Sequence, residues 1–235
     1  MPVTLQASAV VPATPRAAIV RLALGDLDFD YAAGQAVLVG RPDQDVRRPY
    51  SLATAPHEAA RDRAVELLVG LQPDGTAGPH LDDVAAGDML EVIGPVGSFV
   101  LPSEIEARQL LFVAGGTGIA PLRAMIHDAL HRHPTVGLSL LYSARTPEEF
   151  AYGSELRALA GAGRIRLVQT VTRHPEGEWT GERGRLNRSH VTRLLAGRET
   201  LCYVCGPHAH VEDVPRLLRD VGVDSARIRL EELGG

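Results

Sequence analysis

Apolar and polar residues alternate in short segments over the first hundred residues. Turn residues divide these segments, which lie at 16–24, 25–34, 35–40, 49–54, 64–71 and 88–94. A period of two with frequent turns is typical of antiparallel β-structure. We therefore expect residues 1–103 to form antiparallel β-structure, either a small barrel of Greek-key type or a sandwich.

The pattern changes after the segment at 102–109, where strand-like apolar runs begin to alternate with helical stretches. Leu122, Met125, Ile126 and Leu130 recur at helical spacing and would form one apolar face. Alternation of strands and helices over this length predicts a doubly wound α/β domain with a parallel five-stranded sheet, over residues 104–235. The strands are expected at 110–114, 137–143, 164–171, 200–204 and 227–230.

A glycine-rich loop follows the first expected parallel strand. It contains Gly115, Gly116, Thr117 and Gly118 and leads into a helix that we expect to begin near Pro121. Glycines let a ligand approach the backbone, and the free N–H groups of a helix start attract an anion such as pyrophosphate. The loop is not a GxGxxG motif, so a tight strand–helix turn without a ligand explains it equally well.

Arginines follow the second and third expected strands. Arg145 and Arg173 stand where an acidic residue often binds a ribose 2′-hydroxyl and where arginine accommodates a 2′-phosphate. Arg183 and Arg185 come shortly after. Each of them alone is also compatible with an ordinary solvated charge, but together they favour NADPH over NADH.

The segment RPYS in the first half carries three side chains with different chemistry. Arg48 offers a fork for phosphate, Tyr50 a flat face for a ring and Ser51 a hydroxyl for a ring nitrogen. Arg48 and Tyr50 would lie on one side of an extended strand and Ser51 on the other. Pro49 and a half-buried tyrosine would also suit a plain edge strand.

Composition excludes several classes of protein. The net charge is -5 without a basic stripe, which argues against nucleic-acid binding, and no apolar run is long enough to span a membrane. The first residues lack a secretory pattern, so we expect a cytoplasmic protein. Two cysteines are too few for a four-cysteine iron–sulfur cluster.

The histidines do not form a recognisable metal-binding pattern, and we expect no metal site. His127, His131 and His133 lie near the end of one expected helix, where a cationic histidine has an ordinary dipole explanation. His208 and His210 follow the CGP segment and are candidates to line a cleft. The solvated face of a helix is expected to carry three acidic residues: Glu148, Glu149 and Glu155.

Five motifs in order resemble those of the ferredoxin-NADP reductase family of flavoproteins. They are RPYSLA, GPVGSF, VAGGTGIAP, LYSARTPEEFAYGSEL and YVCGP, and the segment around Gly34 and Gln35 that precedes the first is also similar. The resemblance covers nearly the whole chain. It implies an FAD-binding barrel followed by an NAD(P)-binding domain, without a fused iron–sulfur domain.

The resemblance also implies roles for individual residues. Arg48 would contact flavin phosphate beside Pro49, Tyr50 would stack on the isoalloxazine, and Ser51 would lie near flavin N5. The glycine loop would receive the pyrophosphate of the nicotinamide nucleotide, and Arg145 and Arg173 its 2′-phosphate. Pro121 and Arg183 are further expected cofactor-binding residues. Three residues match the family's CGP segment that approaches the nicotinamide: Cys205, Gly206 and Pro207. Glu231 matches the family's glutamate, so Ser51, Cys205 and Glu231 are the expected catalytic residues.

Two departures from the family pattern concern the flavin. In the segment around Gly75 and Gly78, Gly78 stands where serine or threonine usually contacts the flavin pyrophosphate, which leaves FAD and FMN both open. Leu233 stands where related chains often carry an aromatic residue near the flavin. Weaker shielding of the flavin predicts faster loss of electrons to oxygen.

The expected function is hydride transfer between NADPH, or NADH, and FAD, and single-electron transfer between FAD and a separate ferredoxin, flavodoxin or oxygenase component. Two alternatives remain: a reductase of free flavin or small acceptors, and a non-catalytic flavin-binding redox subunit. The chain is expected to be a monomer or weak dimer. The direction of electron flow and the acceptor stay open.

Overall fold

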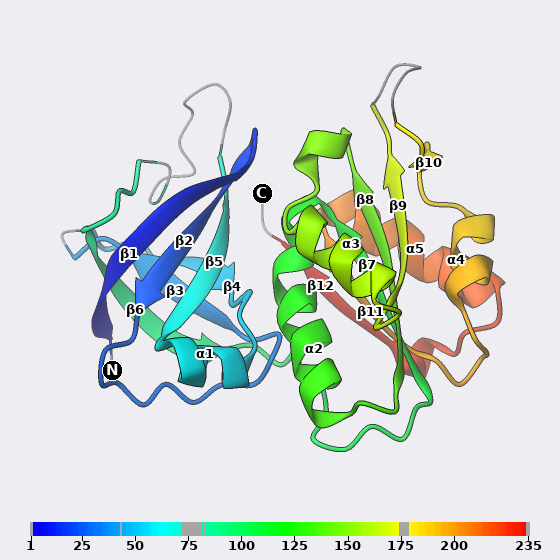
Figure 1. The fold of residues 1–235 in the computed structure, drawn as a ribbon, viewed down its shortest axis with the longest axis horizontal. Helices are drawn as coiled ribbons and strands as arrows, with labels where there is room; N and C mark the ends of the chain where they lie inside the picture. The colour runs from blue at the N-terminus through cyan, green and yellow to red at the C-terminus, as the bar shows by residue number, and fades with distance from the viewer. Residues whose placement is uncertain (1, 43, 72–80, 82, 174–178, 234–235) are drawn as a thin grey trace.

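The computed structural model describes residues 2–42, 44–71, 81, 83–173 and 179–233, and it consists of a β-barrel beside a parallel sheet with helices (Figure 1). The barrel strands are β1 Val3–Thr14, β2 Ala17–Ala23, β3 Ala36–Gly40, β4 Arg48–Ser51, β5 Ala64–Gly70 and β6 Met89–Val96. They pair antiparallel in the order β4-β3-β6-β1-β2-β5. A bridge between Leu52 and Leu67 joins the two edges, and helix α1 (Pro56–Asp62) follows β4.

The barrel is held by the apolar side chains that its alternating strands direct inward. Val20 and Leu22 of β2, Val37 of β3 and Leu67 of β5 are fully buried in one cluster. Intervening positions such as Arg21 remain half-exposed. The period-two pattern of the sequence therefore predicts the barrel interior correctly.

The second sheet is parallel and has the order β10-β9-β8-β7-β11-β12. Its strands are β7 Gln109–Gly115, β8 Gly137–Ala144, β9 Arg166–Val171, β10 Glu182–Arg183, β11 Leu201–Gly206 and β12 Ile228–Glu232. The five predicted strands are all present, so the fold class is confirmed. The count of five was wrong by one, because the edge strand β10 has only two residues and shows no hydrophobic period.

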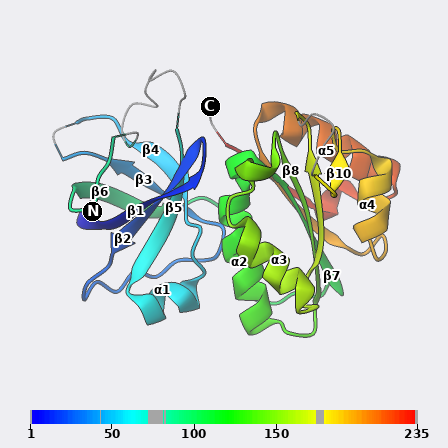
Figure 2. The ribbon, with the colours of Figure 1, turned by 45° about the horizontal axis from the view of Figure 1, so that its top comes forward.

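Helices cover both faces of the parallel sheet. They are α2 Ile119–Arg132, α3 Gly153–Gly161, α4 Arg188–Leu194 and α5 His208–Asp220, with 3₁₀ turns η1 Gly116–Gly118, η2 Pro147–Glu149 and η3 Ser225–Arg227. Helices α2 and α3 lie on the face toward the barrel, and α4 and α5 on the other (Figure 2). Because both faces are covered, every residue of β7 is buried. No helix in the described part of the chain has the length and apolar content to cross a membrane.

The two domains share one hydrophobic cluster across their junction. Ala17, Ala53 and Phe99 of the barrel are buried together with Met125 of α2 and Cys205 of β11. A polar contact joins the same elements, because Nη1 of Arg123 in α2 donates to the carbonyl oxygen of Ala53 at 2.7 Å. Helix α2 is therefore packed against the segment that follows β4.

One barrel position tolerates no side chain at this junction. Gly34 has φ +103°, and a Cβ there would lie 2.2 Å from both Cε of Met125 and the carbonyl oxygen of Phe99. The sequence segment around Gly34 is thus a place where the barrel backbone approaches α2.

Candidate cofactor-binding site

The strand β4 presents the RPYS segment at the edge of the barrel sheet. Its register against β3 pairs Ser51 with Ala36 and Tyr50 with Val37. Ser51 is buried, whereas Arg48 and Tyr50 are half-buried and Pro49 is exposed. Tyr50 and Arg48 keep solvent-facing surface that a ligand can cover, as an extended strand with this order of residues predicts.

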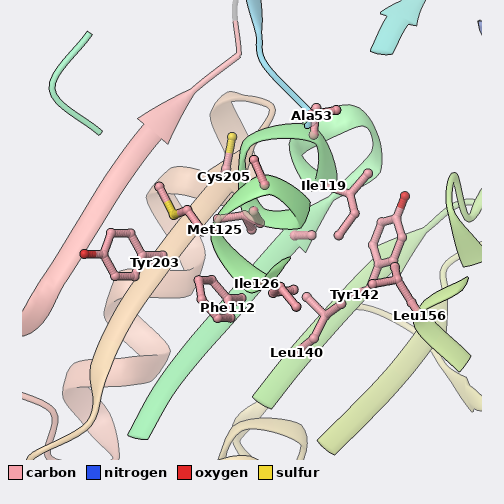
Figure 3. Packing of buried hydrophobic residues seen from close by; sticks show 14 of the residues in the cluster. Ala53, Phe112, Ile119, Met125, Ile126, Leu140, Tyr142, Leu156, Tyr203 and Cys205 are labelled. Atoms are coloured by element: carbon pink, nitrogen blue, oxygen red, sulfur yellow. The ribbon is translucent and has the colours of Figure 1, made fainter. Parts of the chain in front are cut away.

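The chain continues from Ser51 directly into the domain junction. Ala53, two residues later, is fully buried in the cluster that contains Ile119 and Cys205. Figure 3 shows these side chains together around the start of α2. The strand that carries the expected flavin residues and the strand that carries the CGP segment therefore end at the same place.

The glycine loop lies against the end of β11. A Cβ on Gly118 would be 2.2 Å from the carbonyl oxygen of Cys205, and Gly116 has φ +55°. The hydroxyl of Tyr142 donates to the carbonyl oxygen of Gly116 at 3.1 Å. Helix α2 begins at Ile119, two residues before the expected position, and Pro121 lies in its first turn, where a missing N–H is harmless.

His210 fills the space between the glycine loop and the CGP segment. A Cβ on Gly115 would lie 2.9 Å from Nδ1 of His210, and one on Gly206 would lie 2.9 Å from its Cδ2. Burial lowers the pKa of His210, so the ring is neutral at pH 7. His208, by contrast, is exposed and pairs with Glu232 at 3.1 Å.

Cys205 and Glu231 are neighbours at the carboxyl ends of β11 and β12, where the register pairs them. Burial and the charge of Glu231 raise the pKa of Cys205 well above the ordinary thiol value, so the sulfur is a neutral thiol. Burial raises the pKa of Glu231 to about 7. Its Oε2 is buried and has no hydrogen-bond partner among the described residues. A carboxyl group whose pKa is near neutral pH thus lies beside an uncharged thiol.

The chain end continues this arrangement. The backbone N–H of Leu233 donates to the carbonyl oxygen of Gly206 at 3.0 Å, and the side chain packs against the shared cluster. Leu233 therefore lies beside the CGP segment.

The arginines after β8 and β9 come together as expected. The backbone N–H of Arg173 donates to the carbonyl oxygen of Arg145 at 2.7 Å. Partial desolvation and the positive charges of Arg16 and Arg173 lower the pKa of Arg145. Arg183 in β10 directs Nη2 to the carbonyl oxygen of Trp179 at 2.9 Å. The first two arginines form one positive group, and Arg183 has a partner of its own.

Several residues at the site gave no signal in the sequence. Arg16 reaches the parallel-sheet domain from a barrel turn, and it pairs with Glu149 at 2.6 Å. Glu149 and Glu155 were expected on a solvated face, and this was wrong, because both bind cations at the domain junction. Helical periodicity shows which residues face solvent in an isolated helix, but it says nothing about a second domain.

Two expected ligand positions, Gly75 and Gly78, lie outside the described residues. Within the described part of the chain, no group of three or more histidine, cysteine, aspartate or glutamate side chains is arranged to hold a metal ion. Cys202 and Cys205 are both buried and free, and burial raises the pKa of Cys202 to about 12.

Comparisons with known proteins agree with this architecture. The oxidoreductase FAD-binding domain family matches residues 2–101, and the oxidoreductase NAD-binding domain family matches residues 112–216. A ferredoxin-NADP reductase B of Sorangium cellulosum is 35% identical over 215 residues, which are 86% of this chain and 85% of the relative. A flavohemoprotein of Rhodopirellula baltica is 31% identical over 80% of this chain, which spans about half (48%) of that relative's length.

A solved structure has the same two-domain arrangement. The crystal structure of an Amycolatopsis cytochrome P450 reductase superposes with a TM-score of 0.85 at 29% identity, over 98% of this chain and 70% of the other. Both domain families occur in the expected order, and the match to the Sorangium protein runs through most of both chains. The chain therefore belongs to the ferredoxin-NADP reductase family of flavoprotein oxidoreductases.

Proposed function

We propose that this protein transfers electrons between NADPH and a separate electron-carrier protein, through FAD held on the barrel. The observation that carries the proposal is the shared junction, in which Ala53 beyond Ser51 is buried with Cys205 and the start of α2. Bound FAD would supply the chemistry, accepting a hydride at N5 and releasing electrons singly. The residues of the chain then have to bind the two cofactors, orient them toward each other and shield the flavin from solvent.

The residues at the junction fit a flavin and a nicotinamide nucleotide. Gly118 and Gly115 form a cradle that a Cβ would fill, at the start of a helix whose free N–H groups suit a pyrophosphate. Arg48 has a guanidinium for phosphate, and the half-buried ring of Tyr50 has a face for stacking. Oε2 of Glu231 is a further buried polar atom, and it has no hydrogen-bond partner among the described residues.

Each residue of the reaction centre has a proposed task. Ser51 positions the flavin edge from the barrel side, and Cys205 with Gly206 and Pro207 sets the approach of the nicotinamide. Because Cys205 is a neutral thiol, it shapes the site and does not act as a nucleophile. Glu231 can hold or release a proton near neutral pH.

The preference for NADPH over NADH rests on Arg145 and Arg173. Their backbones are hydrogen-bonded at the carboxyl ends of adjacent strands, and neither forms an ion pair within the described part of the chain. Planar guanidinium groups bind phosphate oxygens in a bidentate way, which a ribose diol cannot exploit.

The acceptor is proposed to be a separate ferredoxin, flavodoxin or oxygenase component. The two cysteines of this chain cannot hold a four-cysteine cluster, so a cluster that accepts the electrons would be held by another protein segment. The resemblance to a ferredoxin-NADP reductase and to a reductase of cytochrome P450 supports this class of partner.

The test is anaerobic stopped-flow reduction of the purified protein by NADPH and by NADH, after identification of the released flavin by mass. The proposal expects FAD and faster bleaching by NADPH. A preference below about threefold would contradict the role of the two arginines, because a specific phosphate contact should contribute at least about 1 kcal/mol. A flavin that neither nucleotide bleaches would instead indicate a non-catalytic flavin-binding subunit.

A second assay separates the protein acceptor from free flavin. Cytochrome c reduction is followed with NADPH, with and without added ferredoxin or flavodoxin. The proposal expects turnover to depend on the carrier protein. Equal turnover with free flavin alone would favour a flavin reductase.

A further inference from the structure

The turn between β1 and β2 brings a barrel arginine to the carboxyl edge of the parallel sheet. Arg16 immediately precedes β2, and its Nη2 lies 2.6 Å from Oε2 of Glu149 at the end of η2. Figure 1 shows this hairpin beside the segment that follows β8. Arg16 is thus within reach of the strand end that carries Arg145.

The position of Arg16 is fixed by its surroundings. Its neighbour Ala17 is buried in the cluster shared by the two domains, and its own carbonyl oxygen accepts a hydrogen bond from the N–H of Leu71 at 2.8 Å. A single hydrogen bond from the guanidinium, that to Glu149, is formed among the described residues. Nε is buried without a hydrogen-bond partner among the described residues, so the N–H groups that can reach an anion are those of the Nη atoms that are not directed to Glu149.

Three arginines gather at this edge around one carboxylate. Arg173 is joined to Arg145 through the backbone, and the charges of Arg16, Arg173 and Glu149 all act on Arg145. With Arg145 itself, these four groups carry a net charge of +2. A phosphate monoester carries about -1.5 to -2 at pH 7, which matches that charge. Without Arg16 the net charge would be +1.

We propose that Arg16 is a third arginine of the 2′-phosphate site, contributed by the barrel, and that Glu149 weakens phosphate binding by its negative charge. This inference rests on the proposed function, because the 2′-phosphate belongs to NADPH. A phosphate held by Arg16, Arg145 and Arg173 would contact both domains. Nucleotide selectivity would then depend on a residue outside the nucleotide-binding domain.

A purely structural ion pair makes a different prediction. If Arg16 and Glu149 only tied the domains together, removing either partner would have the same effect on nucleotide binding. In the proposed site the two side chains carry opposite charges, so they have opposite effects on the binding of an anion. Removing Arg16 should weaken phosphate binding, and removing the charge of Glu149 should strengthen it.

The experiment is calorimetric titration of the FAD-loaded protein with 2′,5′-ADP, and with 5′-AMP as the probe that lacks the 2′-phosphate. For Arg16→Gln we expect the affinity for 2′,5′-ADP to fall about five- to tenfold, with less than about a twofold change for 5′-AMP. For Glu149→Gln we expect the affinity for 2′,5′-ADP to rise about two- to threefold.

Arg227→Gln is the matched control. Arg227 also pairs with a glutamate, Glu199, but it lies at the amino ends of β11 and β12, on the opposite edge of the sheet. Arg227→Gln should leave the affinities for 2′,5′-ADP and for 5′-AMP unchanged. Equal losses in Arg16→Gln and Glu149→Gln, or no change in either, would overturn the proposal.

Equal binding of 2′,5′-ADP and 5′-AMP to the unaltered protein would also overturn it. That result would leave the proposed oxidoreductase function standing if NADH still bleaches the flavin. If neither nucleotide bleaches the flavin, the proposed function itself fails, and the two failures are therefore distinguishable.

Discussion

His127 of α2 directs Nδ1 to Oε1 of Glu58 in the barrel helix α1, at 2.9 Å. Its Nε2 faces Glu155 of α3, and Arg123 lies 3.5 Å from Glu58 and 3.1 Å from Glu155. Two carboxylates and two cations from three helices thus form one cluster across the domain junction. All four side chains are mostly buried, so solvent screens these charges weakly.

The histidine of this cluster should make stability depend on pH. Burial alone would lower the pKa of His127, but its contacts with Glu155 and Glu58 raise it to about 9. The charged ring therefore stabilises the fold fully below pH 6.5, and this contribution is lost as the pH rises through 9. His127→Gln should lower the free energy of unfolding at pH 6 by about 1–3 kcal/mol, and urea denaturation should show the difference vanish near pH 10.

His133→Gln is the control for His127→Gln. His133 caps the same helix, and it forms no ion pair among the described residues. Its replacement removes a histidine from the same helix without removing an ion pair. A His127→Gln penalty that stays constant from pH 6 to pH 10 would show that the ring acts by packing and not by charge.

Glu58, the carboxylate partner of His127, should make the free energy of unfolding depend on pH in the acid range. Burial would raise the pKa of Glu58, but the hydrogen bond and charge of His127 outweigh it and hold the pKa at about 2. This stabilisation is present above pH 4.5 and is lost as the pH falls toward 2. Glu58→Gln should lower the free energy of unfolding at pH 6 by about 1–3 kcal/mol and have little effect at pH 2. A penalty that remains at pH 2 would contradict the charge argument.

Gly118 should be intolerant of any side chain. A Cβ at this position would overlap the carbonyl oxygen of Cys205, a backbone atom that cannot turn aside. Gly118→Ala should destabilise the protein by about 1–3 kcal/mol in chemical denaturation. Gly161→Ala is the matched control, because nothing lies within 4 Å of a Cβ there, and it should be neutral or stabilise by about 0.5 kcal/mol. Equal effects of the two changes would refute the close approach.

Local pattern was sufficient to predict the fold. Strands β7, β8 and β11 carry apolar runs, and the helical spacing of Leu122, Met125 and Ile126 matches the buried face of α2. These features depend on residues close together in the chain. The glycine loop was ambiguous for the same reason, since a tight turn and an anion site use the same local residues.

Contacts between the domains could not be predicted in this way. Arg16 and Glu149 are 133 residues apart, and each alone resembles a solvated charge. His127 was interpreted through the dipole of its own helix, whereas its charge is held by carboxylates on two other helices. Only the packing of one domain on the other brings these groups together.

Glu231 should make the free energy of unfolding depend on pH in the opposite sense from Glu58. Its carboxyl is buried without a partner for Oε2 among the described residues, and burial raises its pKa to about 7. Ionisation therefore costs stability as the pH rises from 4.5 through 7. Glu231→Gln should match the unaltered protein near pH 4.5 and exceed it by about 1–3 kcal/mol at pH 8, in thermal or urea unfolding. A Glu231→Gln gain independent of pH would disprove the argument.

The size of the side chain at position 233 should determine how well the site excludes oxygen. Its N–H is bonded to the carbonyl of Gly206, so a larger side chain at this position would remain beside the CGP segment. Leu233→Phe should place a flat ring over the flavin region and reduce the NADPH-dependent production of hydrogen peroxide at least about threefold, because a closed site suppresses side reactions. Leu230→Phe, on the exposed part of β12, should leave that rate unchanged. An equal oxidase rate in Leu233→Phe and the unaltered protein would show that Leu233 does not control access.

Ser51 is expected to act on the hydride transfer and not on nucleotide binding. It is buried at the end of β4, next to the segment that enters the shared cluster. Ser51→Ala should slow single-turnover reduction of the flavin at least about tenfold while the affinity for NADP⁺ stays within about twofold, because only the alignment of the reacting atoms is lost. Ser8→Ala, on the outer surface of the barrel, should change neither quantity. Unchanged reduction in Ser51→Ala would remove Ser51 from the reaction centre, whereas equal losses in rate and affinity would place it in nucleotide binding instead.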